Sequence, residues 1–383
     1  MKFSSFLCLG LTAMSAQAAP ANESVSDLSV DIIDSTINRN SPKSLGPWNY
    51  FTSLHLMGQY VVYKRTGEEQ YFEFIKAWVD RFVDSQGNLN ASIESLDSMH
   101  PGNVLLAMYS ETKEERYKIA AETIRGYIDD YPRIANGAFW HAFWAKHEIW
   151  ADGVFMVNPF LSRFSHLFKD QVEYSNNETT NQVLAYADIL QHDSGLFIHA
   201  YSEPHEATWA HPKTGLSLEL WCRAMGWWGL TVTDLLNVLP EDHANRPRLL
   251  EKFRHFLEGI AKYQDEDTGR WFQIVNRPDD EDNWTETSTS AMFTYTTKMA
   301  LDKGWIEDQY GKFENLVTKG QQGVLDRIVK NDDGDTDILE IVIGTGVGYR
   351  QHYYDRPRET NDLHGTGAVY VHLLFLIYDD FGS

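Results

Sequence analysis

The sequence predicts an all-α protein built from repeated helical hairpins, and three observations support this fold class. Apolar residues recur mostly at helical spacing, as in "YFEFIKAWVDRFVDS" and "ERYKIAAETIRGYIDDY". Strand-like alternation is scarce, and the only plausible short strands are "RWFQIVN" and "ILEIVIG". Turn signals such as "DSQGN", "DDYPR" and "DEDTG" separate the helical stretches.

A short internal repeat indicates that one helix–turn–helix unit is used more than once. Residues 63–71 and 109–117 share the pattern Tyr-x-x-Thr-x-Glu-Glu-x-Tyr, and each lies between an apolar helix end and an amphipathic helix. A fainter version lies at "LFKDQVEYSN". Helix pairs repeated along about 360 residues predict either an open solenoid or a closed ring of hairpins. No Pro/Ser-rich linker follows residue 40, so we expect one domain.

The first 18 residues, "MKFSSFLCLGLTAMSAQA", are typical of a secretory signal peptide, with a basic start, an apolar run and a small-residue cleavage site. We expect a mature domain over 19–383, located in the periplasm or outside the cell. The apolar run is too short to span a membrane, and no later segment is long and apolar enough. Cys8 is lost with the signal, which leaves Cys222 without an intramolecular disulfide partner.

Charge and composition narrow the classes of partner. The formal net charge of −22 argues against nucleic acid and anionic membranes, and any anionic ligand needs local cations to hold it. The chain has 12 Trp, 19 Tyr and 20 Phe, which serve either as core or as stacking surfaces for flat ligands. His141 and His147 are wrongly spaced for one metal on a helix face. We expect neither a metal nor another cofactor, and the oligomeric state is left open.

Five polar side chains stand out because aromatic and aliphatic residues surround them in the sequence: Asp97, His141, Asp152, His199 and Arg223. A carboxyl group in an apolar setting is costly to ionise, so its pKa rises and it can act as a general acid. The guanidinium of Arg223 is suited to bidentate pairing with a substrate carboxylate.

Each of these residues also has a purely structural interpretation. Asp152 is followed by Gly153, which is typical of a turn or a helix-end cap. Asp97 is placed to cap the helix predicted over "GNVLLAMY". His199 is equally consistent with a core histidine, and Arg223 with a buried ion pair.

Nine stretches together resemble one group of carbohydrate-active enzymes: "WNY" (48–50), "LDSMHPGN" (96–103), "GAFWH" (137–141), "IWADGVFMVNPFL" (149–161), "SGLFIHAY" (194–201), "WCRAMGWW" (221–228), "ETSTSAMF" (286–293), "GTG" (344–346) and "NDLHGTGA" (361–368). The resemblance is to the unsaturated rhamnogalacturonyl hydrolases of glycoside hydrolase family 105 and, more distantly, to the unsaturated glucuronyl hydrolases of family 88. It implies an (α/α)6 barrel over the whole mature chain.

The resemblance also implies site residues. Asp152 matches the catalytic acid/base and Asp97 the second carboxylate. The residues matching the sugar pocket are Tyr50, His141, Trp150, His199, Trp221, Arg223 and Trp227. One position departs from the pattern, because Ala142 stands where many relatives have Lys.

The activity implied is removal of a terminal 4,5-unsaturated uronic acid from lyase-generated oligosaccharides, most simply those of the pectin component rhamnogalacturonan. Asp152 would protonate C4 and then accept a proton from the water that adds at C5. Asp97 would keep Asp152 partly protonated, and Arg223 would hold the sugar carboxylate.

Four alternatives are left open. One is an unsaturated β-glucuronyl hydrolase acting on ulvan or other glucuronyl-rhamnose oligosaccharides. Another is an inverting glycosidase on saturated glycans, whose two carboxyl groups would lie about 6.5–9.5 Å apart. A sugar epimerase and a non-catalytic sugar-binding protein are the others.

Overall fold

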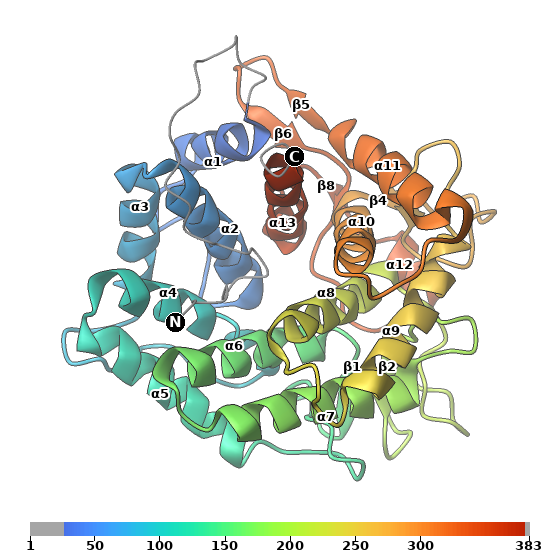
Figure 1. The fold of residues 1–383 in the computed structure, drawn as a ribbon, viewed down its shortest axis with the longest axis horizontal. Coiled ribbons are helices and arrows are strands. Elements are labelled where there is room, and N and C mark those ends of the chain that lie inside the picture. The colour runs from blue at the N-terminus through green and yellow to red at the C-terminus, as the bar shows by residue number, and fades with distance from the viewer. Residues whose placement is uncertain (1–26, 380–383) are drawn as a thin grey trace.

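The computed structural model describes residues 27–379, in which six helices form a closed inner ring (Figure 1). They are α2 (Tyr50–Thr66), α4 (Gly102–Thr112), α6 (Gly153–Phe168), α8 (Cys222–Val238), α10 (Thr287–Asp302) and α13 (Leu363–Asp379). Each packs against the next, and α13 packs against both α10 and α2. The contact between α13 and α2 closes the ring and rules out the open solenoid.

Six further helices surround this ring: α1 (Leu28–Arg39), α3 (Glu69–Val79), α5 (Glu115–Asp129), α7 (Val172–Leu190), α9 (Arg246–Ala261) and α11 (Lys312–Leu325). Their sequences explain their place. α9 buries a single stripe that includes Leu249, Phe253 and Ile260, whereas α8 is buried on nearly every side. The predicted (α/α)6 barrel is confirmed. Within the described residues, no helix is both long and apolar enough to cross a bilayer.

The internal repeat marks the short turns at one end of the barrel. Gly67 caps the end of α2 and Lys113 caps the end of α4, and both residues have left-handed backbone conformations, with φ of 76° and 58°. The repeated threonines make the same hydrogen bonds. The Thr66 hydroxyl donates to the carbonyl of Val62, four residues earlier, and accepts from the amide two residues later. The Thr112 hydroxyl makes the corresponding two bonds at its own position. The fainter third copy is the α6–α7 turn.

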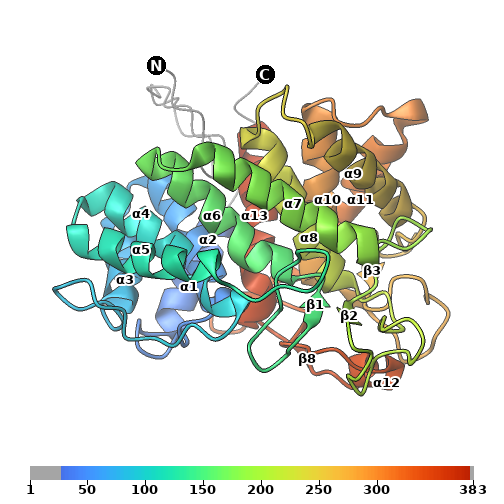
Figure 2. The same cartoon turned by 90° about the horizontal axis from the view of Figure 1, so that it is seen from below.

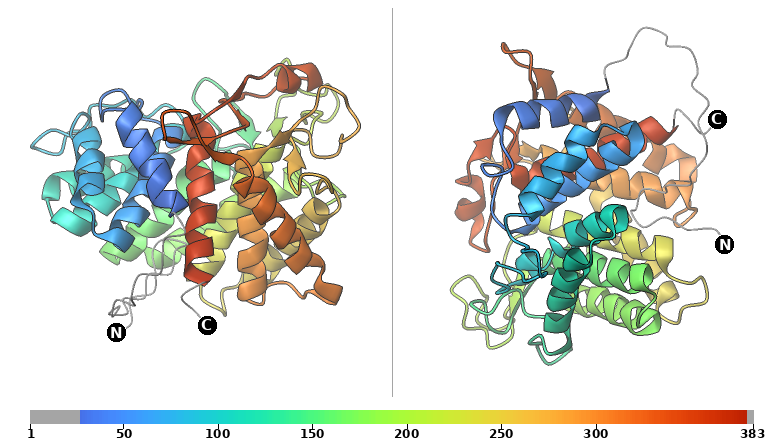
Figure 3. Two further views of the ribbon diagram at one scale, coloured as in Figure 1. Left: turned by 90° about the horizontal axis from the view of Figure 1, so that it is seen from above. Right: turned by 90° about the vertical axis from the view of Figure 1, so that its left-hand side faces the viewer.

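Long loops connect the helices at the opposite end, where Figures 2 and 3 show the small strands and α12 gathered. The strand pairs are β1 (Glu148–Trp150) with β2 (Ala200–Ser202), β3 (Trp271–Phe272) with β4 (Thr285–Glu286), β5 (Ile328–Lys330) with β6 (Thr336–Ile338), and β7 (Ile341–Val342) with β8 (Arg358–Glu359), all antiparallel. The short elements η1 (Leu96–Ser98) and α12 (Arg350–Tyr354) lie in these loops, and η2 (Gln309–Gly311) lies between α10 and α11.

The two predicted strand segments are confirmed, since they contain β3 and β7. The sequence analysis missed β1, β2, β4, β5 and β8, and all but the last residue of β6, because strands of two or three residues are too short to show an alternating pattern. The predicted signal peptide, residues 1–18, lies outside the described residues.

Candidate active site

The inner helices all begin at the end of the barrel that carries the long loops. Tyr50 is the first residue of α2, Asp152 immediately precedes α6, and Trp221 immediately precedes α8. The first-turn amides of these helices therefore face one shared region, which favours negative charge. Most of the site residues predicted from the sequence meet there.

Asp152 occupies the N-cap position of α6, but its side chain makes no capping hydrogen bond. Its Oδ1 instead lies 3.6 Å from Nε2 of His199. The main chain fixes this approach, because the amide of Ala151 donates to the carbonyl of His199 at 2.7 Å, next to the β1–β2 pair. The structural interpretation of Asp152 as a cap is thus right about its position and wrong about its side chain.

His199 is fully buried, and its other ring nitrogen, Nδ1, lies 2.7 Å from the hydroxyl of Tyr353 in α12. Burial raises the pKa of Tyr353, so this hydroxyl keeps its proton and donates it. Burial also lowers the pKa of His199, which favours the neutral ring. The tautomer we assign therefore places Nε2–H toward Asp152. Sequence reasoning missed Tyr353, which nothing local distinguishes from a core tyrosine.

Asp97 lies in η1 and not at the start of α4, so it does not cap that helix. Its Oδ1 is 4.0 Å from Nε2 of His141, a buried ring that stacks on Trp150 with centroids 4.1 Å apart. Atoms of Asp97, His141 and Asp152 all lie within 4.8 Å of one another. The structure therefore brings both predicted carboxylates and both predicted histidines into one cluster.

The two carboxyl groups differ in their affinity for protons. Burial raises the pKa of Asp97 to about 6, with a further contribution from the charge of Asp152. Burial also disfavours the charge on Asp152, but the facing His199 and nearby His141 outweigh it and lower its pKa below the ordinary value. The expectation that the apolar setting of Asp152 would raise its pKa is wrong, because the sequence did not reveal these two neighbours.

The predicted aromatic pocket residues line the same region. The Trp221 ring lies 4.6 Å from the ring of His199. Tyr50 meets Trp227 edge-on at 6.2 Å, and Trp227 stacks on Phe155 at 4.8 Å. These rings give the site apolar walls suited to a flat ligand.

Arg223 is fully buried, and its terminal nitrogens donate to the carbonyls of Val342 and Ile343. Nη1 also lies 3.8 Å from the carboxylate of Glu286. This geometry fits the alternative of a buried ion pair. The carboxylate clamp stays a prediction.

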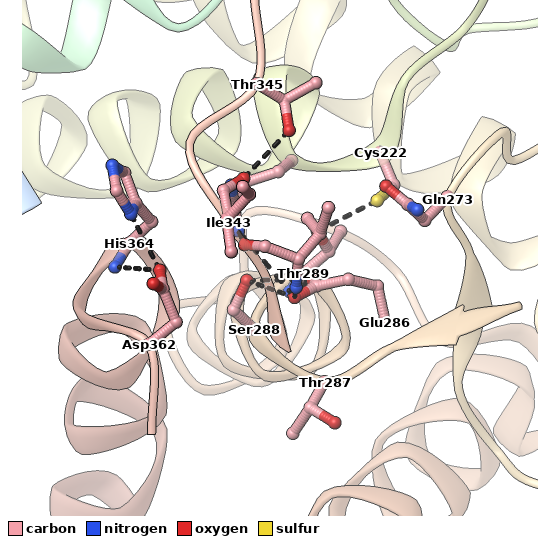
Figure 4. Close-up of polar contacts among 12 residues, drawn as sticks. Cys222, Gln273, Glu286, Thr287, Ser288, Thr289, Ile343, Thr345, Asp362 and His364 are labelled. Atoms are coloured by element: carbon pink, nitrogen blue, oxygen red, sulfur yellow. Dashed lines mark hydrogen bonds and ion pairs between the residues drawn. The ribbon is translucent and has the colours of Figure 1, made fainter. Parts of the chain in front are cut away.

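Glu286 belongs to a network that sequence reasoning did not single out. Its carboxylate accepts from the Thr289 amide at 2.7 Å, from the Ser288 hydroxyl and from the Val342 amide at 3.2 Å. Figure 4 shows the carboxylate of Glu286 beside Ser288 and Thr289, with the Asp362–His364 pair to one side. The network ties α8, α10 and β7 together next to the site.

The cluster of Asp97, His141 and Asp152 is also the place where the described residues offer three potential metal ligands. Two carboxylates and one imidazole suit several divalent cations. The expectation that no metal is needed stays a prediction.

Two acids with unlike proton affinity, walled by aromatic rings, are typical of glycosidases, and this is the enzyme class that the barrel and its site define. The comparison with family models gives the particular family. Residues 29–377 match the model of Glycosyl Hydrolase Family 88, and the chain belongs to this family. The predicted relationship is confirmed.

Three relatives illustrate the similarity. A C. acetobutylicum glycoside hydrolase from family 105 superposes with a TM-score of 0.84 at 27% identity, covering 91% of this chain and 99% of the other. The unsaturated rhamnogalacturonyl hydrolase YesR of Bacillus subtilis is 24% identical over 85% of this chain and 89% of its own length. The unsaturated 3S-rhamnoglycuronyl hydrolase of an Alteromonas species is 27% identical over 57% of this chain and 49% of its own length.

Proposed function

We propose that this glycosidase removes the terminal 4,5-unsaturated uronic acid from oligosaccharides that polysaccharide lyases produce. Membership of family 88 and the similarity to two enzymes named for unsaturated uronyl substrates support the proposal. The helix N-termini around the site favour an anionic sugar although the whole chain carries a formal charge of −22.

The observation that carries the proposal is the close Asp97–Asp152 pair. An oxygen of each lies within 4.8 Å of the other, so the charge of one carboxylate affects the protonation of the other. The inverting alternative stays open, and a test must separate double-bond hydration from displacement at the anomeric carbon.

In the proposed reaction the pair supplies one proton and receives one. The proton rests on Asp97, passes to Asp152 and is delivered to C4, which leaves positive charge on C5 and the ring oxygen. Water adds at C5 and returns a proton to Asp152, whose orientation His199 maintains. The resulting hemiketal opens to a keto sugar and releases the neighbouring sugar.

For the finer substrate, we propose an unsaturated uronyl unit attached to rhamnose, with rhamnogalacturonan fragments of pectin first and ulvan-type glucuronyl-rhamnose fragments second. The names of YesR and of the Alteromonas enzyme support rhamnose in both cases. The parent uronic acid leaves no trace at C4 once the double bond forms, so discrimination must come from the second sugar.

The deciding experiment follows the ultraviolet absorbance of the conjugated double bond. Purified protein is mixed with unsaturated oligosaccharides from rhamnogalacturonan, ulvan, homogalacturonan and chondroitin. We expect absorbance to fall with the rhamnogalacturonan or the ulvan oligosaccharides. Turnover should decline as the pH rises above about 6, where Asp97 loses its proton. Cleavage of saturated glycans with unchanged absorbance of the unsaturated ones would refute the proposal.

We further propose that the enzyme works outside the cytoplasm, which the signal-like residues 1–18 support. N-terminal sequencing of the protein recovered from the periplasm or medium tests this, and we expect a start at Ala19.

A further inference from the structure

Trp144 is unusual among the 12 tryptophans of the chain. It is 66% exposed, whereas every other tryptophan among the described residues is buried or half-buried. A large apolar ring open to water is informative when it adjoins a functional site, because it offers a ready contact surface.

The exposed ring continues an aromatic wall that leads into the site. Its centroid lies 5.5 Å from that of Trp150, nearly perpendicular, and 6.0 Å from that of His141. His141 in turn faces Asp97 and stacks on Trp150. The wall therefore extends from the carboxylate pair to the surface, and Trp144 forms its outer end.

The main chain holds Trp144 in place. The amide of Ala145 donates to the carbonyl of Ala142 at 3.1 Å, which closes a tight turn around Trp144. The preceding residue, Phe143, donates its amide to the carbonyl of Glu94 at 2.9 Å. A ring carried by an anchored turn loses little further freedom when a ligand covers it.

The charges beside this wall favour an uncharged ligand. The Trp150 indole donates to the Glu148 carboxylate at 3.0 Å, so a negative group lies alongside the rings. Ala142, at the base of the turn, is buried and brings no cation. A second anionic group on the ligand would be repelled by the Glu148 carboxylate alongside the rings, and the first cation after the turn, Lys146, is exposed to solvent.

We propose that Trp144 is a stacking platform for the sugar that follows the terminal uronate, and that this sugar is uncharged. The inference rests on the proposed function and adds a residue that sets specificity for the second sugar. The C–H face of a neutral pyranose covers the indole, and a 6-deoxy sugar adds an apolar methyl group to the contact.

The test compares Trp144→Ala with the matched control Phe143→Ala. Phe143 is the neighbouring exposed aromatic residue, but its ring stacks on Tyr131, with centroids 5.3 Å apart, and not on the wall formed by Trp144, Trp150 and His141. Each variant is assayed on an unsaturated uronyl disaccharide with a neutral second sugar and on the methyl glycoside of the unsaturated uronic acid, which lacks that sugar.

For Trp144→Ala we expect kcat/KM on the disaccharide to fall about tenfold, mainly through KM, because one aromatic contact is lost. The methyl glycoside should be hydrolysed at the wild-type rate, Phe143→Ala should resemble the wild type on both, and Trp144→Phe should recover most of the loss. Equal losses on both substrates, or no loss on either, overturn the platform. A wild-type preference for a sulfated second sugar overturns its proposed neutrality.

A failure of the proposed function would appear differently, as no hydrolysis of either compound by the wild type. In that case, binding of the same disaccharide is followed by tryptophan fluorescence. Binding that weakens about tenfold in Trp144→Ala and not in Phe143→Ala supports the platform. Equal binding by all three proteins, or no binding by the wild type, overturns it.

Discussion

Asp152 and Glu286 occupy the same position on two inner helices, the N-cap of α6 and the N-cap of α10, yet the hydrogen bonds and surroundings of their carboxylates differ. Glu286 accepts hydrogen bonds from Ser288, Thr289 and Val342 and is fully buried against Arg223. Asp152 makes no capping bond, its side chain is 14% exposed, and it faces His199 with Asp97 and His141 nearby. One carboxylate is committed to structure, while the other is oriented and left free to react.

The largest expected effect follows from changing the free carboxylate. Asp152→Asn should lower kcat by about 10³–10⁴-fold, because an amide neither delivers a proton to carbon nor accepts one from water. The free energy of unfolding should change by about 1 kcal/mol or less, since the side chain makes no capping bond. Absorbance assays and urea unfolding measure the two quantities. Near-normal turnover by a folded variant would remove Asp152 from the mechanism.

For Glu286 we expect the opposite, a large change in stability. Glu286→Gln keeps the size of the side chain but leaves the buried Arg223 without its acidic partner, which should cost about 3–5 kcal/mol of unfolding free energy. The matched control is Glu266→Gln, an exposed residue expected to change stability by about 0.5 kcal/mol at most. Urea midpoints of the three proteins provide the comparison. An unchanged midpoint in Glu286→Gln would show that the network contributes no net stability.

This contrast also shows what the sequence allowed us to predict. Helical periodicity and the repeated turn at Gly67 and Lys113 are local, so the hairpins were predictable. Closure was not predictable from pattern, because it depends on α13 meeting α2 from the other end of the chain. Asp152 was conspicuous because its neighbours in sequence are apolar, but its pKa depends on His199, a neighbour only in space.

Two further omissions have the same cause. The hydroxyl of Tyr353 reaches His199 across 154 residues of sequence, and no local pattern marks that tyrosine. Glu286 precedes a Ser/Thr-rich helix start, which indicates a cap but does not reveal the buried Arg223 beside it. The role of a residue whose partner lies far away in the sequence can be assigned only when the fold is known.

A smaller effect, on stability, distinguishes the two acids of the pair. Burial raises the pKa of Asp97 from 3.8 to about 6, so the folded protein holds this proton more tightly than the unfolded chain does. Stability from this group is therefore present below about pH 4 and is lost as the pH rises to about 6. Asp97→Asn cannot ionise and should be more stable than the wild type by about 2–3 kcal/mol above pH 6, with little difference near pH 4.

Urea unfolding at several pH values measures this difference, and Asp152→Asn is the internal contrast. The pKa of Asp152 is lowered, so its charge stabilises the fold above the ordinary pKa and that contribution disappears as the pH falls. The stability differences of the two variants from the wild type should therefore have opposite signs at neutral pH. If both stability differences have the same sign, the assignment of a raised pKa to Asp97 and a lowered pKa to Asp152 is wrong.

The smallest expected effect concerns the residue behind the histidine. In Tyr353→Phe, His199 Nδ1 loses its donor, the ring is no longer held with Nε2–H toward Asp152, and kcat should fall about tenfold. The loss of that N–H contact should also raise the pKa of Asp152 and shift the acidic limb of the pH–rate profile upward. The control is Tyr354→Phe, which removes the adjacent hydroxyl from Asp280, 2.8 Å away, without touching His199. If both variants lose similar stability but only Tyr353→Phe shifts the pH profile, Tyr353 positions the base; if neither shifts it, Tyr353 is part of the packing alone.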